Sequence, residues 1–158
     1  MEISKTVLLE ELAQLVRADL EAAERAQRVT VEGATHEEAR PENDKDTRAL
    51  EQSYLARGQA QRVEQLRSEL AAVLALKPRN FPDGAPIALG AVVVAEEDAA
   101  LRTLFIAPAR GGSELPGAVQ VVTPTSPLGR ALIGKSAGDL CEVRLPQRLR
   151  EIAIVSVA

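Results

Sequence analysis

The sequence predicts an α+β protein, in which two long helices form an antiparallel coiled-coil hairpin ahead of a small antiparallel sheet with one short helix. Apolar residues in the first half of the chain recur at three- and four-residue spacing, which is the period of a helix. After a segment with two prolines and a glycine, the period changes to two, which is typical of strands. We therefore expect a helical hairpin over residues 1–77, a linker over 78–85 and a sheet domain over 86–158.

The helical pattern covers residues 5–29 and 47–76, and the first of these stretches contains no proline or glycine. The second shows the three-four-three apolar spacing of a coiled coil in Val63, Leu66, Leu70 and Val73. We expect Tyr54 and Leu55 to pack in the same helix–helix interface. Breakers lie between the two patterns, so we place the tip of the hairpin at about residues 33–46, around Gly33 and Pro41.

The second half of the chain contains β-branched runs that are separated by turn residues. The predicted strands are 89–95, 101–107, 118–124, 140–145 and 151–157. One short helix is expected between the third and fourth strands. Ser126 is its N-cap, Pro127 occupies its first position and Gly134 ends it. Strands joined by short connections with a single helix predict a small antiparallel α+β domain.

Composition excludes several functional classes. The chain of 158 residues contains one His and one Cys, too few for a zinc site or an internal disulfide. A Cys/His nucleophilic pair for catalysis is disfavoured, because it would have to join His36 at the hairpin tip to Cys141 in a strand of the other predicted domain. No apolar run approaches the ~20 residues of a membrane span, so we expect a cytoplasmic protein. The net charge of −4 argues against nonspecific binding to a nucleic-acid duplex.

Acidic residues gather at the predicted tip, where residues 36–46 read HEEARPENDKD. One interpretation is structural, because carboxylates at the start of a helix complement its dipole. A second is functional, because carboxylate oxygens suit Mg²⁺, which proteins often hold by only one or two such ligands. Exposed acids at the end of a long hairpin would then complete a metal site in another protein. The candidate ligands are Glu42, Asp44 and Asp46.

A ten-residue pattern in the second half resembles a known signature. Residues 126–135 read SPLGRALIGK, and Gly138-Asp139 and a predicted strand follow. This pattern is similar to the C-terminal signature of the bacterial Gre transcript-cleavage factors, the GreA/GreB-like transcription elongation factors. The layout of a helical hairpin followed by a sheet domain also resembles that family. The resemblance implies that the C-terminal domain is FKBP-like.

The resemblance also implies a function. The C-terminal domain would dock on bacterial RNA polymerase at its secondary channel, and the hairpin would enter the channel and stimulate the polymerase's own cleavage of backtracked RNA. The docking residues would come from the signature: Ser126, Pro127, Leu128, Arg130, Lys135 and Asp139. The tip acids would help to hold the second Mg²⁺ of the polymerase active site in a two-metal mechanism. The chain would then be a monomer without catalysis of its own, with no stably bound cofactor and only indirect contact with RNA.

Alternative functions stay open at this point. In the Gre family the tip carries Asp and Glu three residues apart, and alignment through the second helix places Glu42 and Lys45 there. A lysine would repel the metal, so the chain could instead be a Gre-like regulator that occupies the channel without cleavage. A coiled-coil dimerisation module remains a further alternative. A prolyl isomerase is disfavoured, because after Leu76 only Phe81 and Phe105 could line an aromatic pocket.

Overall fold

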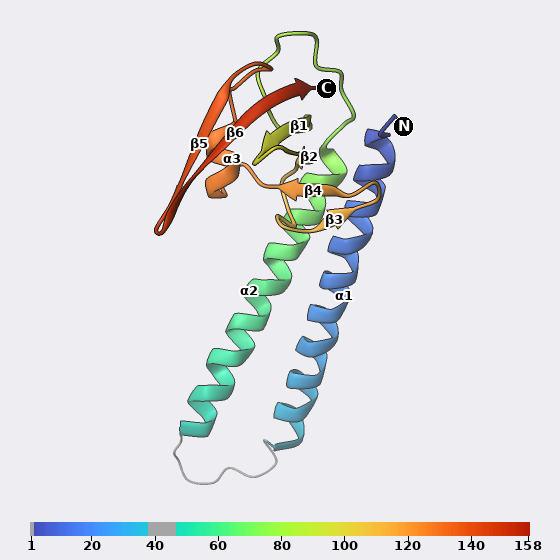
Figure 1. The fold of residues 1–158 in the computed structure, drawn as a ribbon. Coiled ribbons are helices and arrows are strands. Elements are labelled where there is room, and N and C mark those ends of the chain that lie inside the picture. Colours follow the sequence, from blue (N-terminus) through green and yellow to red (C-terminus); the bar gives the residue numbers. More distant parts are fainter. Residues whose placement is uncertain (1, 38–46) are drawn as a thin grey trace. The chain divides into compact units, whose positions relative to one another are not determined.

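The computed structural model describes residues 2–37 and 47–158, except for the side chains of residues 34–37 (Figure 1). The elements are α1 (Lys5–Glu37), α2 (Thr47–Ala75), β1 (Val92–Glu97), β2 (Ala100–Ile106), β3 (Glu114–Leu115), β4 (Val119–Val122), α3 (Pro127–Leu132), β5 (Leu140–Leu145) and β6 (Arg148–Val157). They divide into two compact units. The hairpin unit is Leu15–Ala71, and the sheet unit joins the described residues up to Gln14 with Ala72–Ala158.

The hairpin unit consists of two helices side by side. Gln59 donates a hydrogen bond to the Ala26 carbonyl at 3.5 Å, and Arg67 pairs with Glu24 at 3.5 Å between Nη2 and Oε1. Two long helices at these positions confirm the predicted architecture. However, α1 continues to Glu37 and does not end near residue 29. A glycine inside a helix costs only about 1 kcal/mol, which explains why Gly33 does not interrupt α1.

Apolar burial in the hairpin unit is confined to one part of its length. Val16, Val63 and Leu66 are fully buried, whereas no described apolar residue between residues 17 and 62 is. The prediction that Tyr54 and Leu55 pack between the helices is wrong, because they are 64% and 53% exposed. Their spacing is compatible with a helix, but it places them away from the helix–helix interface. None of the described helices is long and apolar enough to cross a membrane.

The sheet unit contains one six-stranded sheet in the order β3-β4-β2-β1-β6-β5. Its neighbouring strands are antiparallel except for β2 and β4, which are parallel, so the expectation of a fully antiparallel sheet is wrong at this pair. The reason is β3, which lies between the predicted strands 101–107 and 118–124, where the sequence indicated only turn residues. The chain leaves β2, forms β3 at the sheet edge and reverses into β4 through Gly117 and Ala118. This reversal leaves β4 running in the direction of β2.

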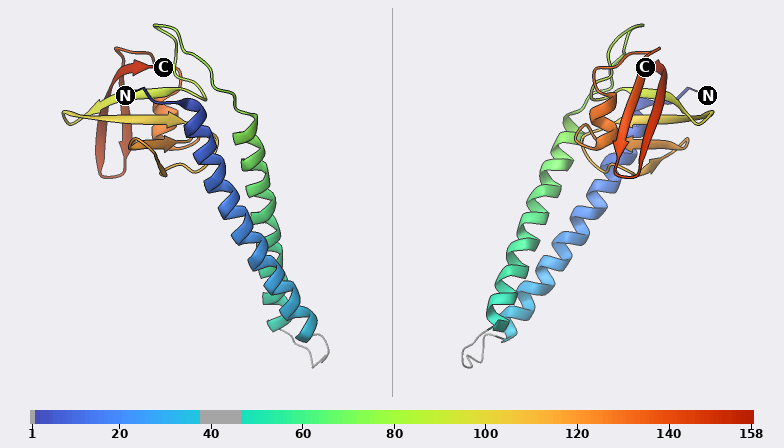
Figure 2. Two further views of the ribbon diagram at one scale, coloured as in Figure 1. Left: turned by 90° about the vertical axis from the view of Figure 1, so that its right-hand side faces the viewer. Right: turned by 60° about the vertical axis from the view of Figure 1, so that its left-hand side comes forward.

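Both faces of the sheet carry buried side chains. On one face, Val93, Leu104 and Ile154 belong to a core that also contains Leu132 of α3 and Cys141 of β5. Figures 1 and 2 show α3 beside β5 on this face. Burial raises the pKa of the Cys141 thiol, which is consistent with a structural role for this side chain. On the opposite face, the buried residues include Val92, Phe105, Val119 and Val121.

The segment that was predicted to be a linker belongs to the sheet unit. Lys5 Nζ donates a hydrogen bond to the Arg79 carbonyl at 2.6 Å, and Ser136 Oγ donates one to the Gly84 carbonyl at 3.1 Å. Within the segment, the Ala85 amide donates to the Pro82 carbonyl at 3.0 Å. The segment is therefore attached to the start of α1 at one end and to the turn after α3 at the other.

Candidate functional site around helix α3

The signature residues build α3 and the turns at its two ends. Ser126 has extended backbone angles, with φ −70° and ψ 158°, and its Oγ accepts a hydrogen bond from the Gly129 amide at 3.0 Å. The same hydroxyl donates to the Thr123 carbonyl at 2.8 Å. Pro127 follows at the first helical position, where a missing amide hydrogen has no cost. The predicted N-cap is therefore confirmed. Both hydrogen bonds of the Ser126 hydroxyl go to backbone groups.

Gly129 is required by a close contact between α3 and the preceding turn. A Cβ atom at this position would lie 1.9 Å from the Thr123 carbonyl oxygen and 2.8 Å from its carbon. No side chain fits such a space, so glycine alone allows α3 to approach the end of β4. Gly129 lies within the signature, but no local sequence pattern reports this close contact.

The second half of the signature attaches α3 to the sheet unit. Gly134 has φ +86°, the left-handed conformation that favours glycine, and its amide donates to the Ile87 carbonyl at 2.9 Å. The Ile87 amide in turn donates to the Lys135 carbonyl at 2.7 Å. Asp139 Oδ2 accepts from the Ser136 amide at 2.8 Å and closes the turn before β5. Asp139 is therefore placed to hold this turn.

The remaining signature residues form an exposed surface beside α3, which we call the α3 face. Pro127, Arg130 and Lys135 are exposed, and Leu128 is partly buried against the core. Ile133 is 39% exposed and was not among the predicted contact residues. A large apolar side chain flanked by two cations is a combination suited to contact with another protein, because it offers both burial and charge complementarity.

A groove of about 490 Å³ borders the start of α3. It is lined by Gly112, Thr123, Pro127, Leu128, Leu145 and Arg150, among others. The signature thus supplies one wall, and β5 and β6 supply another. The wall built by the signature could be predicted from the sequence. The wall built by β5 and β6 could not, because no local pattern connects Leu145 or Arg150 to residues 126–128.

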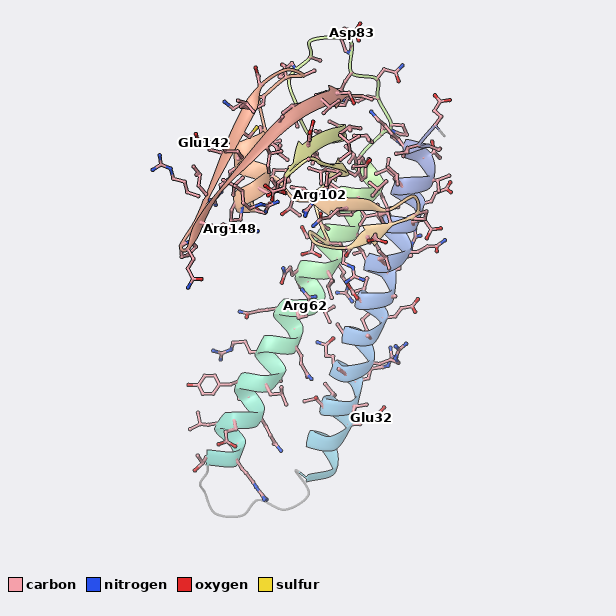
Figure 3. The ribbon with its side chains drawn as sticks, viewed as in Figure 1. Glu32, Arg62, Asp83, Arg102, Glu142 and Arg148 are labelled. Atoms are coloured by element: carbon pink, nitrogen blue, oxygen red, sulfur yellow. The ribbon has the colours of Figure 1, made fainter. Side chains whose placement is uncertain are left out.

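A buried ion pair fixes Arg150 at this groove. Glu97, at the end of β1, is 8% exposed and accepts hydrogen bonds from Arg150 Nε at 2.6 Å and Nη2 at 2.7 Å. Arg102 of β2 lies 3.7 Å from the same carboxylate. Figure 3 labels Arg102 together with Arg148, whose charge also acts on Glu97. The pair joins two strands and holds the Arg150 guanidinium at the groove.

The ionisation of both partners reflects this geometry. The hydrogen bonds from Arg150 lower the pKa of Glu97 below its usual range, against the opposing effect of burial, and the charges of Arg150, Arg102 and Arg148 add to the lowering. The hydrogen bond to Glu97 raises the pKa of Arg150 in turn. Both groups are therefore charged at neutral pH, and the guanidinium is held in one orientation.

The tip acids Glu42, Asp44 and Asp46 lie outside the described residues, so the structure gives no geometry for them. Elsewhere, among the residues that the structure does describe, no group of three or more His, Cys, Asp or Glu side chains could hold a metal ion. The tip segment is bounded by the described ends of α1 and α2 at Glu37 and Thr47. Carboxylates remain the donor type that Mg²⁺ prefers, so their chemistry fits the metal predicted from the sequence.

Comparison with known proteins gives similarity at the level of sequence. A family model described as "Transcription elongation factor, GreA/GreB, C-term" matches residues 85–158. Transcription elongation factor GreA of Xanthomonas axonopodis pv. citri (strain 306) is 32% identical over 154 residues, 92% of each chain. The protein of the same name from Polaromonas naphthalenivorans (strain CJ2) is 31% identical over 96 residues, 61% of this chain. That match spans only 60% of the Polaromonas protein.

Comparison with solved structures gave matches with low TM-scores. The GreA factor homolog 1 (Gfh1) protein of Thermus thermophilus is 19% identical, with a TM-score of 0.40 over 95% of this chain and 92% of that one. Prokaryotic transcription elongation factor GreA/GreB from Nitrosomonas europaea is 21% identical, with a TM-score of 0.38 over 70% of this chain and 93% of that one.

Proposed function

Because the chain belongs to the GreA/GreB family of transcription elongation factors, we propose that it binds bacterial RNA polymerase at the secondary channel and stimulates the polymerase's intrinsic cleavage of backtracked RNA. The sheet unit docks on the polymerase through the α3 face, and the hairpin unit enters the channel. The observation that carries this proposal is the structure built by the signature residues, in which Ser126, Gly129 and Asp139 shape a turn–helix–turn that exposes Arg130 and Lys135.

The hairpin unit has the properties of a segment that reaches into a partner. The part of α1 that belongs to it runs from Leu15 to Glu37 and measures about 35 Å at ~1.5 Å per residue. Away from Val16 and Val63, the helices expose large apolar side chains: Val29, Val31, Leu50, Tyr54 and Leu55. Exposed large apolar side chains are available for contact with a partner. These side chains would lie against the channel wall.

The acidic tip would supply the chemistry. Glu42, Asp44 and Asp46 are the residues that would share the second Mg²⁺ of the polymerase active site, a metal that generates and orients a water nucleophile. In this chain their task is to present carboxylate oxygens at the end of the hairpin. The catalytic groups that act on RNA belong to the polymerase, so the protein is an accessory factor and not an enzyme in its own right.

A second candidate function rests on Lys45. A cation next to Asp44 and Asp46 weakens the attraction of the tip for a divalent metal. If Lys45 occupies a position where the metal binds, the protein fills the channel and modulates or inhibits transcription without stimulating cleavage. The substitution Lys45→Glu distinguishes the two functions, because it would create cleavage in the second case and leave it largely unchanged in the first.

The test is an RNA cleavage assay on stalled, backtracked elongation complexes of the cognate polymerase. Wild type is compared with Glu42→Gln, Asp44→Asn and Asp46→Asn at saturating Mg²⁺, with Glu32→Gln on the described part of α1 as the matched control. We expect wild type and the control to shorten the RNA and at least one tip variant to lose this activity. Unchanged cleavage in all three tip variants would contradict the assigned role of the acids.

A further inference from the structure

A second groove lies in the sheet unit, at the start of α1, and shares no lining residue with the groove beside α3. Its volume is about 950 Å³, near the upper end of the ~300–1,000 Å³ that is usual for ligand sites. The residues that matter here are Ile3, Lys5, Arg79, Phe81, Val92 and Val94. The signature and the hairpin tip account for none of them.

Two cations gather on one aromatic ring in this groove. Lys5 Nζ lies 4.7 Å from the centroid of the Phe81 ring, and Arg79 Cζ lies 4.4 Å from it. Lys5 Nζ also donates a hydrogen bond to the Arg79 carbonyl at 2.6 Å, which leaves further ammonium hydrogens available. Within residues 2–33 and 47–158, where side chains are described, neither cation has a carboxylate at ion-pair distance.

The proximity of the two cations has an electrostatic cost. Burial lowers the pKa of Lys5, and the charge of Arg79 lowers it further. The ring attracts both cations, but a ring has no net charge and cannot neutralise them. An anion between Lys5 and Arg79 would reduce the repulsion and favour the charged form of Lys5. Glu2 also lines the groove and offsets one of the two positive charges, so the lining keeps a net positive charge around Lys5 and Arg79.

The apolar side chains of the groove restrict which anionic ligands could fill it. Ile3, Val92 and Val94 line the groove beside the cations, so a ligand that fills it needs apolar groups next to its charge. A phosphate ion would leave this wall uncovered. A nucleic-acid base needs a free aromatic face for stacking, whereas both cations already lie over Phe81.

We propose that this groove binds a short acidic peptide segment of a protein partner, in which carboxylates alternate with large apolar side chains. A carboxylate pairs with the guanidinium of Arg79, which has the planar donor geometry for a bidentate contact, and with the ammonium of Lys5. The neighbouring apolar side chains cover Ile3 and Val94, which are both partly exposed. This site goes beyond docking at the α3 face and does not depend on it.

The experiment measures binding of a labelled peptide in which glutamate alternates with leucine, by fluorescence anisotropy with the full chain. Variants Lys5→Gln and Arg79→Gln are compared with wild type, and Lys77→Gln is the matched control because Lys77 is exposed nearby and lines no part of the groove. We expect each of the two groove variants to weaken binding about tenfold or more, and the control to bind like wild type. The Lys5 ammonium should also show a higher pKa by NMR when peptide is bound.

Three competitors test the chemistry of the ligand in the same assay. A peptide with glutamine in place of glutamate should not compete, nor should inorganic phosphate or a single-stranded RNA oligonucleotide at equal concentration. The proposal is overturned if the glutamate–leucine peptide does not bind, or if Lys77→Gln weakens binding as much as Arg79→Gln. It is also overturned if RNA competes more strongly than the peptide. RNA cleavage by the variants on backtracked complexes reports separately on the proposed elongation function.

Discussion

Glu97 and Arg150 join β1 to β6, because the Arg150 guanidinium donates two hydrogen bonds to the Glu97 carboxylate, at 2.6 Å from Nε and 2.7 Å from Nη2. The side chains are 8% and 16% exposed, so the pair is formed largely away from water. Its position beside the α3 groove connects the stability of the sheet with the shape of the proposed docking surface. A buried pair of this kind is costly to break, because removal of one partner leaves the other charge without compensation.

The first prediction concerns the loss of one partner of this ion pair. Arg150→Met should lower the free energy of unfolding of the sheet unit by about 2–4 kcal/mol, a value reduced from that of a fully buried pair because Arg102 remains near Glu97. Native-state hydrogen exchange of the β1 and β6 amides measures the effect. The control Arg144→Met removes an exposed arginine from β5 and should change the free energy by less than about 0.5 kcal/mol. Equal effects of the two substitutions would contradict the importance of the pair.

The second prediction concerns pH. The folded-state pKa of Glu97 lies below its usual 4.5, chiefly because of the hydrogen bonds from Arg150. The pair therefore stabilises the folded state fully above the unfolded-state pKa, and this contribution is lost as the pH falls through the folded-state pKa. Between about pH 6 and pH 3, wild type should lose stability more steeply than Glu97→Gln. Urea midpoints across this range test the prediction, and parallel pH profiles for the two proteins would refute it.

The third prediction separates two reasons for glycine in the signature. Gly129→Ala places a Cβ 1.9 Å from the Thr123 carbonyl oxygen, so α3 must move away from the turn. We expect a loss of about 3 kcal/mol or more and a weaker polymerase interaction. Gly134→Ala meets no atom within 4 Å and is opposed only by φ +86°, at about 1 kcal/mol. Thermal unfolding of the two variants compares them, and a similar loss in both would show that the close contact is not decisive.

The fourth prediction is a gain in stability. Asp98 and Ala99 connect β1 and β2 with φ of +53° and +62°, the left-handed angles that a two-residue hairpin turn requires. Alanine is unfavourable in this conformation, so Ala99→Gly should stabilise the sheet unit by about 0.5–1 kcal/mol after the greater freedom of glycine in the unfolded chain is deducted. Ala100→Gly, at the first position of β2, should destabilise it instead. Calorimetry measures both changes in melting temperature.

Sequence reasoning succeeded where the information was local. The caps of α3 follow from Ser126, Pro127 and Gly134 alone, and the structure has the helix at residues 127–132. The end of α1 was less predictable, because a single glycine weakens a helix without deciding where it ends. Its continuation to Glu37 depends on the energy of the whole helical segment and not on Gly33.

Features that depend on distant pairing could not be predicted. Glu97 and Arg150 are 53 residues apart in the chain. Their meeting depends on the register of β1 and β6, which shifts between Val94 and Ala95 because Val155 is an extra residue there. Such a shift changes which side chains share a face, and no sequence period reports it. The two-residue strand β3 is likewise invisible to periodicity, because only its pairing with β4 defines it as a strand.

In the proposed function, the α3 face docks on the polymerase and the acidic tip supplies the metal-holding carboxylates, so the two roles reside in different parts of the chain. The most direct test adds an excess of the triple variant Glu42→Gln, Asp44→Asn, Asp46→Asn to a cleavage reaction stimulated by wild type. If the α3 face docks independently of the tip acids, this variant suppresses cleavage by occupying the polymerase. The same excess should not suppress cleavage when the variant additionally carries Arg130→Glu and Lys135→Glu. Unreduced cleavage with the triple variant, or equal suppression by both proteins, would contradict the account.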